Sequence, residues 1–177
     1  TRVALGLLGG GSDASRAAQD EFDDWYDTEH IPERLRIPGF INAVRWVGTE
    51  NPRISLAIYD LESLDVLTKP EYRAVSPERF SPWSRRILLG KCGRLCRFNC
   101  VQTTPGDKVA PQQGAGLFVF AANPESANSE RFAQWLAGEH LARMAAVPGV
   151  LCARAFRTPD NAPGSSSHRY VATFHTE

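Results

Sequence analysis

The chain has 177 residues, of which 42% are hydrophobic and 23% charged, as expected for a globular protein of one domain or two small ones. Lysine plus arginine and aspartate plus glutamate number 20 each, so the net charge gives no reason to expect nucleic acid or an anionic membrane as a partner. Apolar stretches are too short to span a membrane and no signal peptide is recognisable, so a cytoplasmic protein is expected.

The first half alternates predicted strands with helical segments. An apolar strand over residues 2–8 runs into GGGSD, which we expect to be a loop, since it lacks the lysine of a P-loop and the spacing of a dinucleotide fingerprint. An amphipathic helix begins near Ser15 and should end or kink near His30, because Pro32 disfavours helical geometry in the residue before it. The remaining predictions are strands over 40–48, 54–62 and 94–103, and a proline-broken helical segment over 63–90.

Three of the four cysteines, Cys92, Cys96 and Cys100, stand four residues apart in KCGRLCRFNC. Structural zinc and iron–sulfur sites usually use closer pairs with further cysteine or histidine ligands, and none follow here. On a strand, Cys96 and Cys100 would share one face with Phe98 as small core residues, and in the cytosol we expect free thiols. The four histidines also lack metal-ligand spacing, so we predict no metal site.

A polar linker over residues 105–115 leads to a second half in which the same order restarts. The predicted elements are a strand over 116–122, a helix over 128–147, and strands over 148–156 and 168–176, the last preceded by a long loop. A second helix and fourth strand, present in the first half, do not follow. We therefore divide the chain into units over 1–104 and 116–177.

The two halves also share a sequence pattern. FDDWYDTEHIPERLRIPGFINAVRW, residues 22–46, matches FAQWLAGEHLARMAAVPGVLCARAF, residues 132–156, at Phe, Trp, Glu-His and Pro-Gly. Each half reads as a split βαβ unit, whose sheet has helices on one face and leaves the other face open. We predict an α+β fold in which tandem ferredoxin-like repeats pack sheet-to-sheet as a pseudo-dimeric α/β barrel, either monomeric or as a homodimer.

The run FDDWYDTEHIPERLRIPGF resembles the EthD-like and related dimeric α/β-barrel proteins, whose first helix ends in a W…H-x-P pattern before a Pro-Gly turn. This resemblance implies a cofactor-independent pocket for a small hydrophobic, aromatic, polyketide-like or lactone molecule. It implies decarboxylase, isomerase, cyclase or oxygenase chemistry that depends on proton transfer. By position, the histidine of such a site falls on His30 and His140. The second copy departs from the pattern, with Leu141-Ala142 in place of Ile-Pro.

His30 is the leading catalytic candidate. It stands where the helix is expected to end, and imidazole is a natural general base near neutral pH. Glu29 can tune or orient it, and His140 is its counterpart in the second half. The competing reading is structural, with His30 bonding a carbonyl at the helix end.

Further side chains are candidates for substrate contact. Trp25 and Trp135 precede the Glu-His pairs on the apolar side of each helix, where they can equally be core residues. Tyr26 and Asp27 have no counterpart in the second half. The remaining candidates come from strands and from the proline-broken segment: Arg45, Tyr59 and Trp83.

The leading prediction is thus a lyase or isomerase that uses no cofactor. Two other classes stay open. One is a non-catalytic small-ligand-binding or stress-related barrel, for which a paired Glu-His is not required. The other is a haem-handling barrel, which would show a Soret band when purified.

Overall fold

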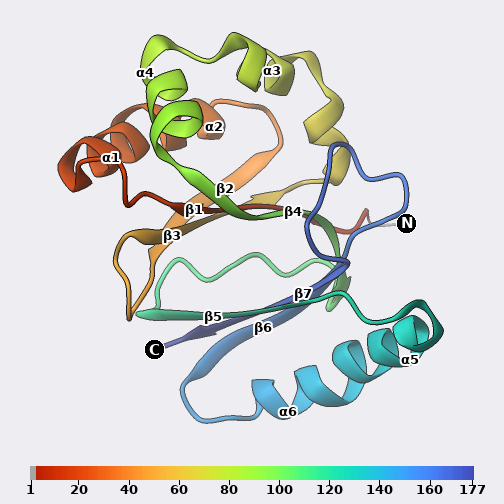
Figure 1. Cartoon of the computed structure of the whole chain (residues 1–177). Coiled ribbons are helices and arrows are strands. Elements are labelled where there is room, and N and C mark those ends of the chain that lie inside the picture. Colours follow the sequence, from red (N-terminus) through yellow and green to blue (C-terminus); the bar gives the residue numbers. More distant parts are fainter. Residues whose placement is uncertain (1–2) are drawn as a thin grey trace.

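In the computed structural model, which describes residues 3–177, two layers of strands face each other and helices cover the outer side of each layer (Figure 1). The strands are β1 (Gly6–Asp13), β2 (Phe40–Val47), β3 (Ile54–Leu61), β4 (Gly93–Thr104), β5 (Gly116–Ala122), β6 (Val150–Arg157) and β7 (Tyr170–Thr176). The α-helices are α1 (Gln19–Trp25), α2 (Ile31–Leu35), α3 (Pro70–Arg73), α4 (Pro82–Ser84), α5 (Ser129–Gln134) and α6 (Leu141–Ala145).

Tighter and wider helical turns extend these helices. The tighter, 3₁₀ turns are η2 (Leu64–Thr68), η3 (Pro77–Arg79) and η5 (Ser126–Asn128). The wider, π-helical turns are η1 (Tyr26–His30), η4 (Arg85–Lys91) and η6 (Trp135–His140). Within residues 3–177, none of the helices is both long enough and apolar enough to cross a bilayer.

All seven strands belong to one antiparallel sheet with the order β2-β3-β1-β4-β6-β7-β5. β4 is the long strand, with 12 residues, and it pairs with β1 along its length and with β6 near its C-terminal end. The sheet therefore folds over at β4, so that β1 to β3 lie in one layer and β5 to β7 in the other (Figure 1). The predicted α+β class is confirmed.

The inner faces of the two layers form a shared core. It contains Leu7, Ile58, Phe98, Cys100, Phe156 and Val171, which come from strands of both layers. Cys96 packs against this cluster, as predicted for the cysteine face of β4. Burial of this face, which a single helix-covered layer would leave exposed to water, is what holds the layers together.

The glycine-rich stretch is not a loop, and that expectation was wrong. Gly9, Gly10 and Gly11 lie inside β1. A Cβ on Gly9 would stand 2.6 Å from Cδ2 of Phe98, and one on Gly11 would stand 2.5 Å from Sγ of Cys96. Glycine is needed here because large side chains of β4 cover β1, not because the chain turns.

The first helix also does not end at His30. It continues from α1 through the π-helical turn η1 into α2, and Pro32 sits in the first turn of α2. The π-helical turn η1 is the interruption of regular α-helix that Pro32 predicted near His30. The helix of the second half has the same order of segments: α5, the π-helical turn η6 and α6.

The linker over residues 105–115 runs between the two layers (Figure 1). The backbone N–H of Ala110 donates to Oδ2 of Asp60 at 2.7 Å, and the carbonyl of Lys108 accepts from Nη1 of Arg154 at 3.2 Å. Asp60 Oδ1 and Arg154 Nη1 lie 2.7 Å apart, and both side chains are almost inaccessible to solvent. This buried ion pair joins β3 in one layer to β6 in the other.

Candidate functional site

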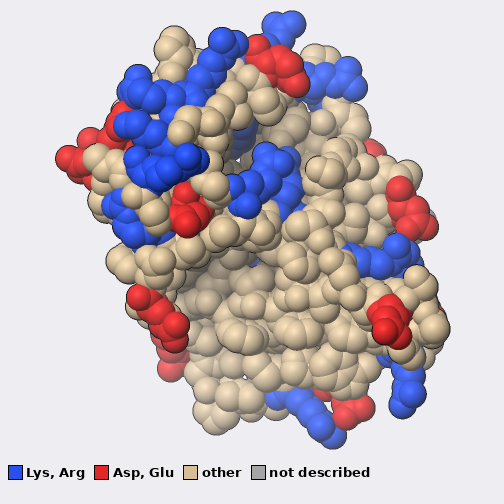
Figure 2. Space-filling model, viewed as in Figure 1, with Lys and Arg blue, Asp and Glu red and all other residues tan. Residues whose placement is uncertain are grey.

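A cavity of about 350 Å³ lies between the layer containing β1 and the segment that carries α3 and α4. Figure 2 shows lysine and arginine side chains beside a hollow in the upper half of the molecule. The cavity is lined by three arginines, three tyrosines and one histidine among other residues, and no carboxylate is among the described residues that line it. The site is therefore aromatic and cationic.

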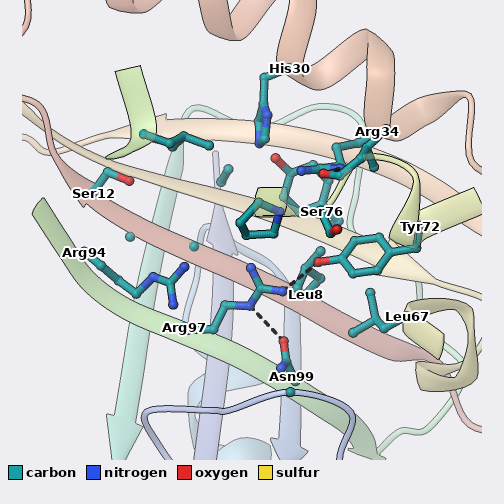
Figure 3. Close-up of a pocket in the computed structure, with 18 of the residues that line it drawn as sticks. Leu8, Ser12, His30, Arg34, Leu67, Tyr72, Ser76, Arg94, Arg97 and Asn99 are labelled. Atoms are coloured by element: carbon teal, nitrogen blue, oxygen red, sulfur yellow. Dashed lines mark hydrogen bonds between the residues drawn. The ribbon is translucent and has the colours of Figure 1, made fainter. Parts of the chain in front are cut away.

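The π-helical turn η1 positions His30. In an α-helix, residues five apart do not share a face, but the wider π turn brings Trp25 and His30 together. Their rings stack with centroids 4.6 Å apart and an interplanar angle of 29°. The imidazole points into the cavity (Figure 3) and meets Tyr26 edge-on at 5.1 Å. The turn thus presents the histidine to the cavity with an indole behind it.

His30 is held in its neutral form. It is 7% exposed, and its buried Nδ1 has no hydrogen-bond partner among the described residues. Burial lowers the pKa of His30 well below its ordinary value, and the nearby cations of Arg34 and Arg97 lower it further. A neutral imidazole can accept a proton, and negative charge on a bound molecule would offset the effect of the arginines.

Two of the arginines are held in place by hydrogen bonds. Arg97 donates from Nε to Oδ1 of Asn99 at 3.0 Å and from Nη2 to the hydroxyl of Tyr72 at 2.8 Å (Figure 3). Arg34 donates from Nη1 to the carbonyl of Val75 at 3.1 Å, and its guanidinium lies 5.5 Å from the centre of the Tyr72 ring. Tyr72 therefore packs between two cations, which fixes its segment over the cavity.

Two tyrosines of the cavity, Tyr26 and Tyr59, are neutral phenols. Burial raises the pKa of Tyr26 to about 12, and burial followed by the neighbouring Tyr26 raises that of Tyr59 well above its ordinary value. The hydroxyl of Tyr59 is buried without a hydrogen-bond partner in the described part of the chain. It is a donor available to a molecule in the cavity.

The second half contributes to this site through the loop before β7. Pro163, Gly164 and Ser165 line the cavity. Asn99 donates from Nδ2 to the carbonyl of Pro163 at 2.8 Å while its Oδ1 accepts from Arg97. The site is therefore built by both halves of the chain, with Asn99 as the connection between the loop and Arg97.

Of the residues predicted from sequence, the structure brings His30, Tyr26 and Tyr59 together in the cavity. Trp25 lies behind His30 in the core. Glu29 does not contact the imidazole; its carboxylate accepts hydrogen bonds from the hydroxyls of Ser81 and Ser84.

Glu29 instead belongs to a partly buried connection between η1 and α4. The hydroxyl of Ser84 donates to Glu29 at 2.8 Å and accepts from the indole N–H of Trp25 at 3.1 Å. These bonds hold the segment over the cavity against the turn that carries His30.

Other predicted residues lie outside the cavity. Arg45, on β2, pairs with Asp23 of α1 at 2.9 Å and with Asp27 of η1 at 3.8 Å, and its guanidinium covers the ring of Tyr26. Trp83, on α4, is half-buried and packs against the core cluster that contains Trp25.

His140 and Trp135 belong to the layer of β5 to β7. Their rings stack at 4.5 Å, with an interplanar angle of 24°. This pair reproduces the geometry of Trp25 and His30, but it does not line the cavity.

Four polar residues of the cavity were not predicted from the sequence: Arg34, Arg94, Arg97 and Asn99. One signal was present: if Phe98 and Cys100 face the sheet core, Arg97 and Asn99 must face the side covered by helices. A charged residue on a covered face indicates a functional site. Within residues 3–177, no group of three or more histidine, cysteine or acidic side chains is placed to hold a metal ion.

Comparison with solved structures places this architecture among known folds. An anthrone oxidase-like protein aligns with a TM-score of 0.63 at 14% identity, over 98% of this chain and 73% of its own. A chlorite dismutase-like protein aligns with a TM-score of 0.59 at 10% identity, over 98% of this chain and 80% of its own. No family model and no curated protein matches the sequence. The chain therefore shares its fold with these two proteins.

Proposed function

We propose that the protein is a cofactor-independent enzyme that moves a proton on a small aromatic, polyketide-like or lactone substrate, with His30 as the base. The observation that supports this most directly is a neutral, unpaired imidazole directed into a cavity with aromatic walls and cationic groups. The anthrone oxidase-like structural neighbour makes tricyclic phenols and anthrones the first substrates to test.

In this mechanism a C–H bond beside a carbonyl, or a phenolic O–H bond, gives its proton to the imidazole of His30. The electron pair of the broken bond moves onto the substrate oxygen as an enolate or phenolate. Arg97 and the hydroxyl of Tyr59 stabilise that oxygen, because fixed donors act strongly where charge develops. Return of the proton at another carbon completes an isomerisation, and loss of a neighbouring group completes a lyase reaction.

We further propose that the chain is an EthD-like tandem of two ferredoxin-like units, over 1–104 and 116–177. The equal stacking of Trp25 on His30 and of Trp135 on His140, each over a π-helical turn, supports this. In this view the first unit retains the catalytic histidine and the second serves as scaffold and loop donor.

A second candidate function is non-catalytic binding of the same kind of molecule. It is favoured by the absence of any hydrogen bond from Nδ1 of His30 to an orienting acceptor in the described residues. A general base is usually held by such an acceptor.

The substitution His30→Gln tests the catalytic role, with His140→Gln as the matched control because it removes the equivalent stacked imidazole of the other half. We expect His30→Gln to keep its far-UV circular dichroism spectrum and to lose about 100-fold or more in kcat/KM. His140→Gln should lose little.

Turnover retained in folded His30→Gln removes His30 from the mechanism. A wild-type protein that binds the substrate panel without turnover, with affinity unchanged in His30→Gln, favours the binding function. A Soret band in purified protein would contradict both.

A further inference from the structure

We propose that the molecule bound beside His30 is an aromatic carboxylic acid, whose carboxylate is held by Arg94 and Arg97. This inference rests on the proposed function of the same cavity and specifies its substrate class. Three observations support it. They are the register of β4, the open floor of the cavity, and the lack of an ion-pair partner for Arg94 and Arg97 within residues 3–177.

A β-bulge places the two arginines on one face. Along an uninterrupted strand, residues three apart point to opposite sides of the sheet. In the pairing of β1 with β4, Arg97 is opposite Gly10 and Arg94 is opposite Ser12, and the register shifts between them so that Leu95 has no partner of its own. The extra residue turns Arg94 to the side of Arg97, as bulges do beside active sites.

The floor beneath these arginines is empty. A Cβ on Gly10 would meet no heavy atom within 4 Å, whereas Gly9 and Gly11 are covered by side chains of β4. Figure 3 shows Arg94 and Arg97 rising from β4 into the space below His30. A bound group can therefore contact both guanidinium groups and still reach the imidazole.

Within the part of the chain that the structure describes, Arg94 and Arg97 have no ion-pair partner. Arg97 is fixed by Asn99 and Tyr72, neither of which carries a negative charge, and this leaves Nη1 without a partner in residues 3–177. Arg94 makes no ion pair there. Arg34 approaches one carboxylate, that of Glu33, only at 4.0 Å. Converging cations without a counter-ion are expected where an anionic ligand supplies one.

The other walls of the cavity indicate the chemistry of the part of the ligand that lies beyond the carboxylate. Leu8, Tyr26, Tyr59 and Leu67 offer apolar and aromatic surface. A carboxylate matches the fork geometry of a guanidinium, and an aromatic ring suits these walls. A cavity of about 350 Å³ is in the range for a ligand of two or three rings.

The test compares binding of hydroxynaphthoic acid with binding of its primary amide, which has nearly the same shape and no charge, by calorimetry. We expect the wild type to prefer the acid by about 10-fold or more, the range for a charge-assisted hydrogen bond. Arg97→Gln should reduce this preference to about 2-fold or less, and Arg97→Lys should keep part of it. The matched control is Arg131→Gln, which changes an exposed arginine on α5 and should leave the preference unchanged.

Arg94→Gln serves as a second variant in case Arg97→Gln does not fold. Arg94 is exposed, so its replacement should not disturb the core. It should also weaken acid binding. Equal binding of acid and amide, a preference that survives in both Arg97→Gln and Arg94→Gln, or no acid binding up to about 10 mM overturns the inference. Competition by inorganic phosphate as strong as by the acid would show a general anion site and also overturn it.

The experiment separates this inference from the proposed function. Acid preference with no turnover in any variant retains the carboxylate site and rejects His30 as a base. Turnover that depends on His30 without an acid preference retains the base and rejects the carboxylate site.

Discussion

His30 and His175 are both buried, at 7% and 2% exposure, and each lies near an arginine. Their surroundings differ in what they offer to a ligand. His30 borders a cavity, whereas His175 lies between the sheet layers, where its ring meets Trp46 edge-on at 5.9 Å. Burial, followed by Arg154, lowers the pKa of His175 from 6.5 to about 4, and the carboxylate of Asp60 acts in the opposite direction. A molecule in the cavity can therefore contact His30, whereas His175 is expected to affect stability.

The lowered pKa of His175 predicts acid sensitivity. Between pH 6.5 and about 4 the unfolded chain binds a proton at this residue and the folded chain does not. The stabilising effect of a neutral His175 is therefore complete above pH 6.5 and is lost progressively as the pH falls from 6.5 to about 4. Urea unfolding across this range should show a smaller loss of stability for His175→Gln than for the wild type. An equal loss in the two proteins would contradict the role of His175.

At the scale of elements, two irregularities build the site. The π-helical turn η1 brings Trp25 behind His30, and the bulge at Leu95 turns Arg94 toward Arg97. Both insert one residue into a regular repeat, and each re-aims a side chain that the regular element would direct elsewhere. The glycines of β1 complete the site by leaving its floor open at Gly10.

Gly9 and Gly10, neighbours in β1, predict a contrast between two alanine substitutions. Gly9→Ala places its Cβ 2.6 Å from the Phe98 ring, so the core between the layers must shift, at a cost of about 1–3 kcal/mol. Gly10→Ala meets nothing within 4 Å and should change stability by less than about 1 kcal/mol. Thermal unfolding of both variants measures the difference. Equal melting temperatures of the two variants would show that the strand accommodates the methyl group of Gly9→Ala without loss of stability.

At the scale of the whole molecule, the two layers are joined by strand β4, by the linker and by the loop before β7. The ion pair of Asp60 and Arg154 lies at the centre of this junction, and Asp60 also accepts from Ala110 in the linker and Asn42 in β2. The cavity depends on this assembly, because the loop at Pro163, from the second half, accepts a hydrogen bond from Asn99, which in turn accepts one from Arg97.

Removing one partner of that ion pair should weaken the whole fold. Asp60→Asn leaves the Arg154 guanidinium buried without a counter-charge, and we expect a loss of about 3–5 kcal/mol in the free energy of unfolding. The double variant Asp60→Asn, Arg154→Met should lose less than the two single variants together.

The control is the exposed pair of Arg143 and Glu139, with side chains 77% and 55% accessible. Glu139→Gln should change stability by less than about 0.5 kcal/mol. Denaturant titration compares all these variants. A loss below about 1 kcal/mol for Asp60→Asn would show that the layers do not depend on the pair.

The sequence by itself determined the strand and helix order, the α+β class and the cysteine face of β4, because these follow from local periodicity and composition. It also singled out His30, through the Trp and Glu-His pattern. Its interpretation of GGGSD as a loop failed because the reason for glycine there lies in Phe98 and Cys96, which are distant in sequence.

Only the tertiary structure decided which charged residues meet. A bulge is a mismatch between two paired strands, so neither strand alone shows that Arg94 and Arg97 share a face. Likewise, the place of Glu29 against Ser81 and Ser84 depends on how α4 packs over η1. The elements are set by interactions between near neighbours in the chain, whereas the cavity is set by contacts between residues far apart, and those exist only once the layers have packed.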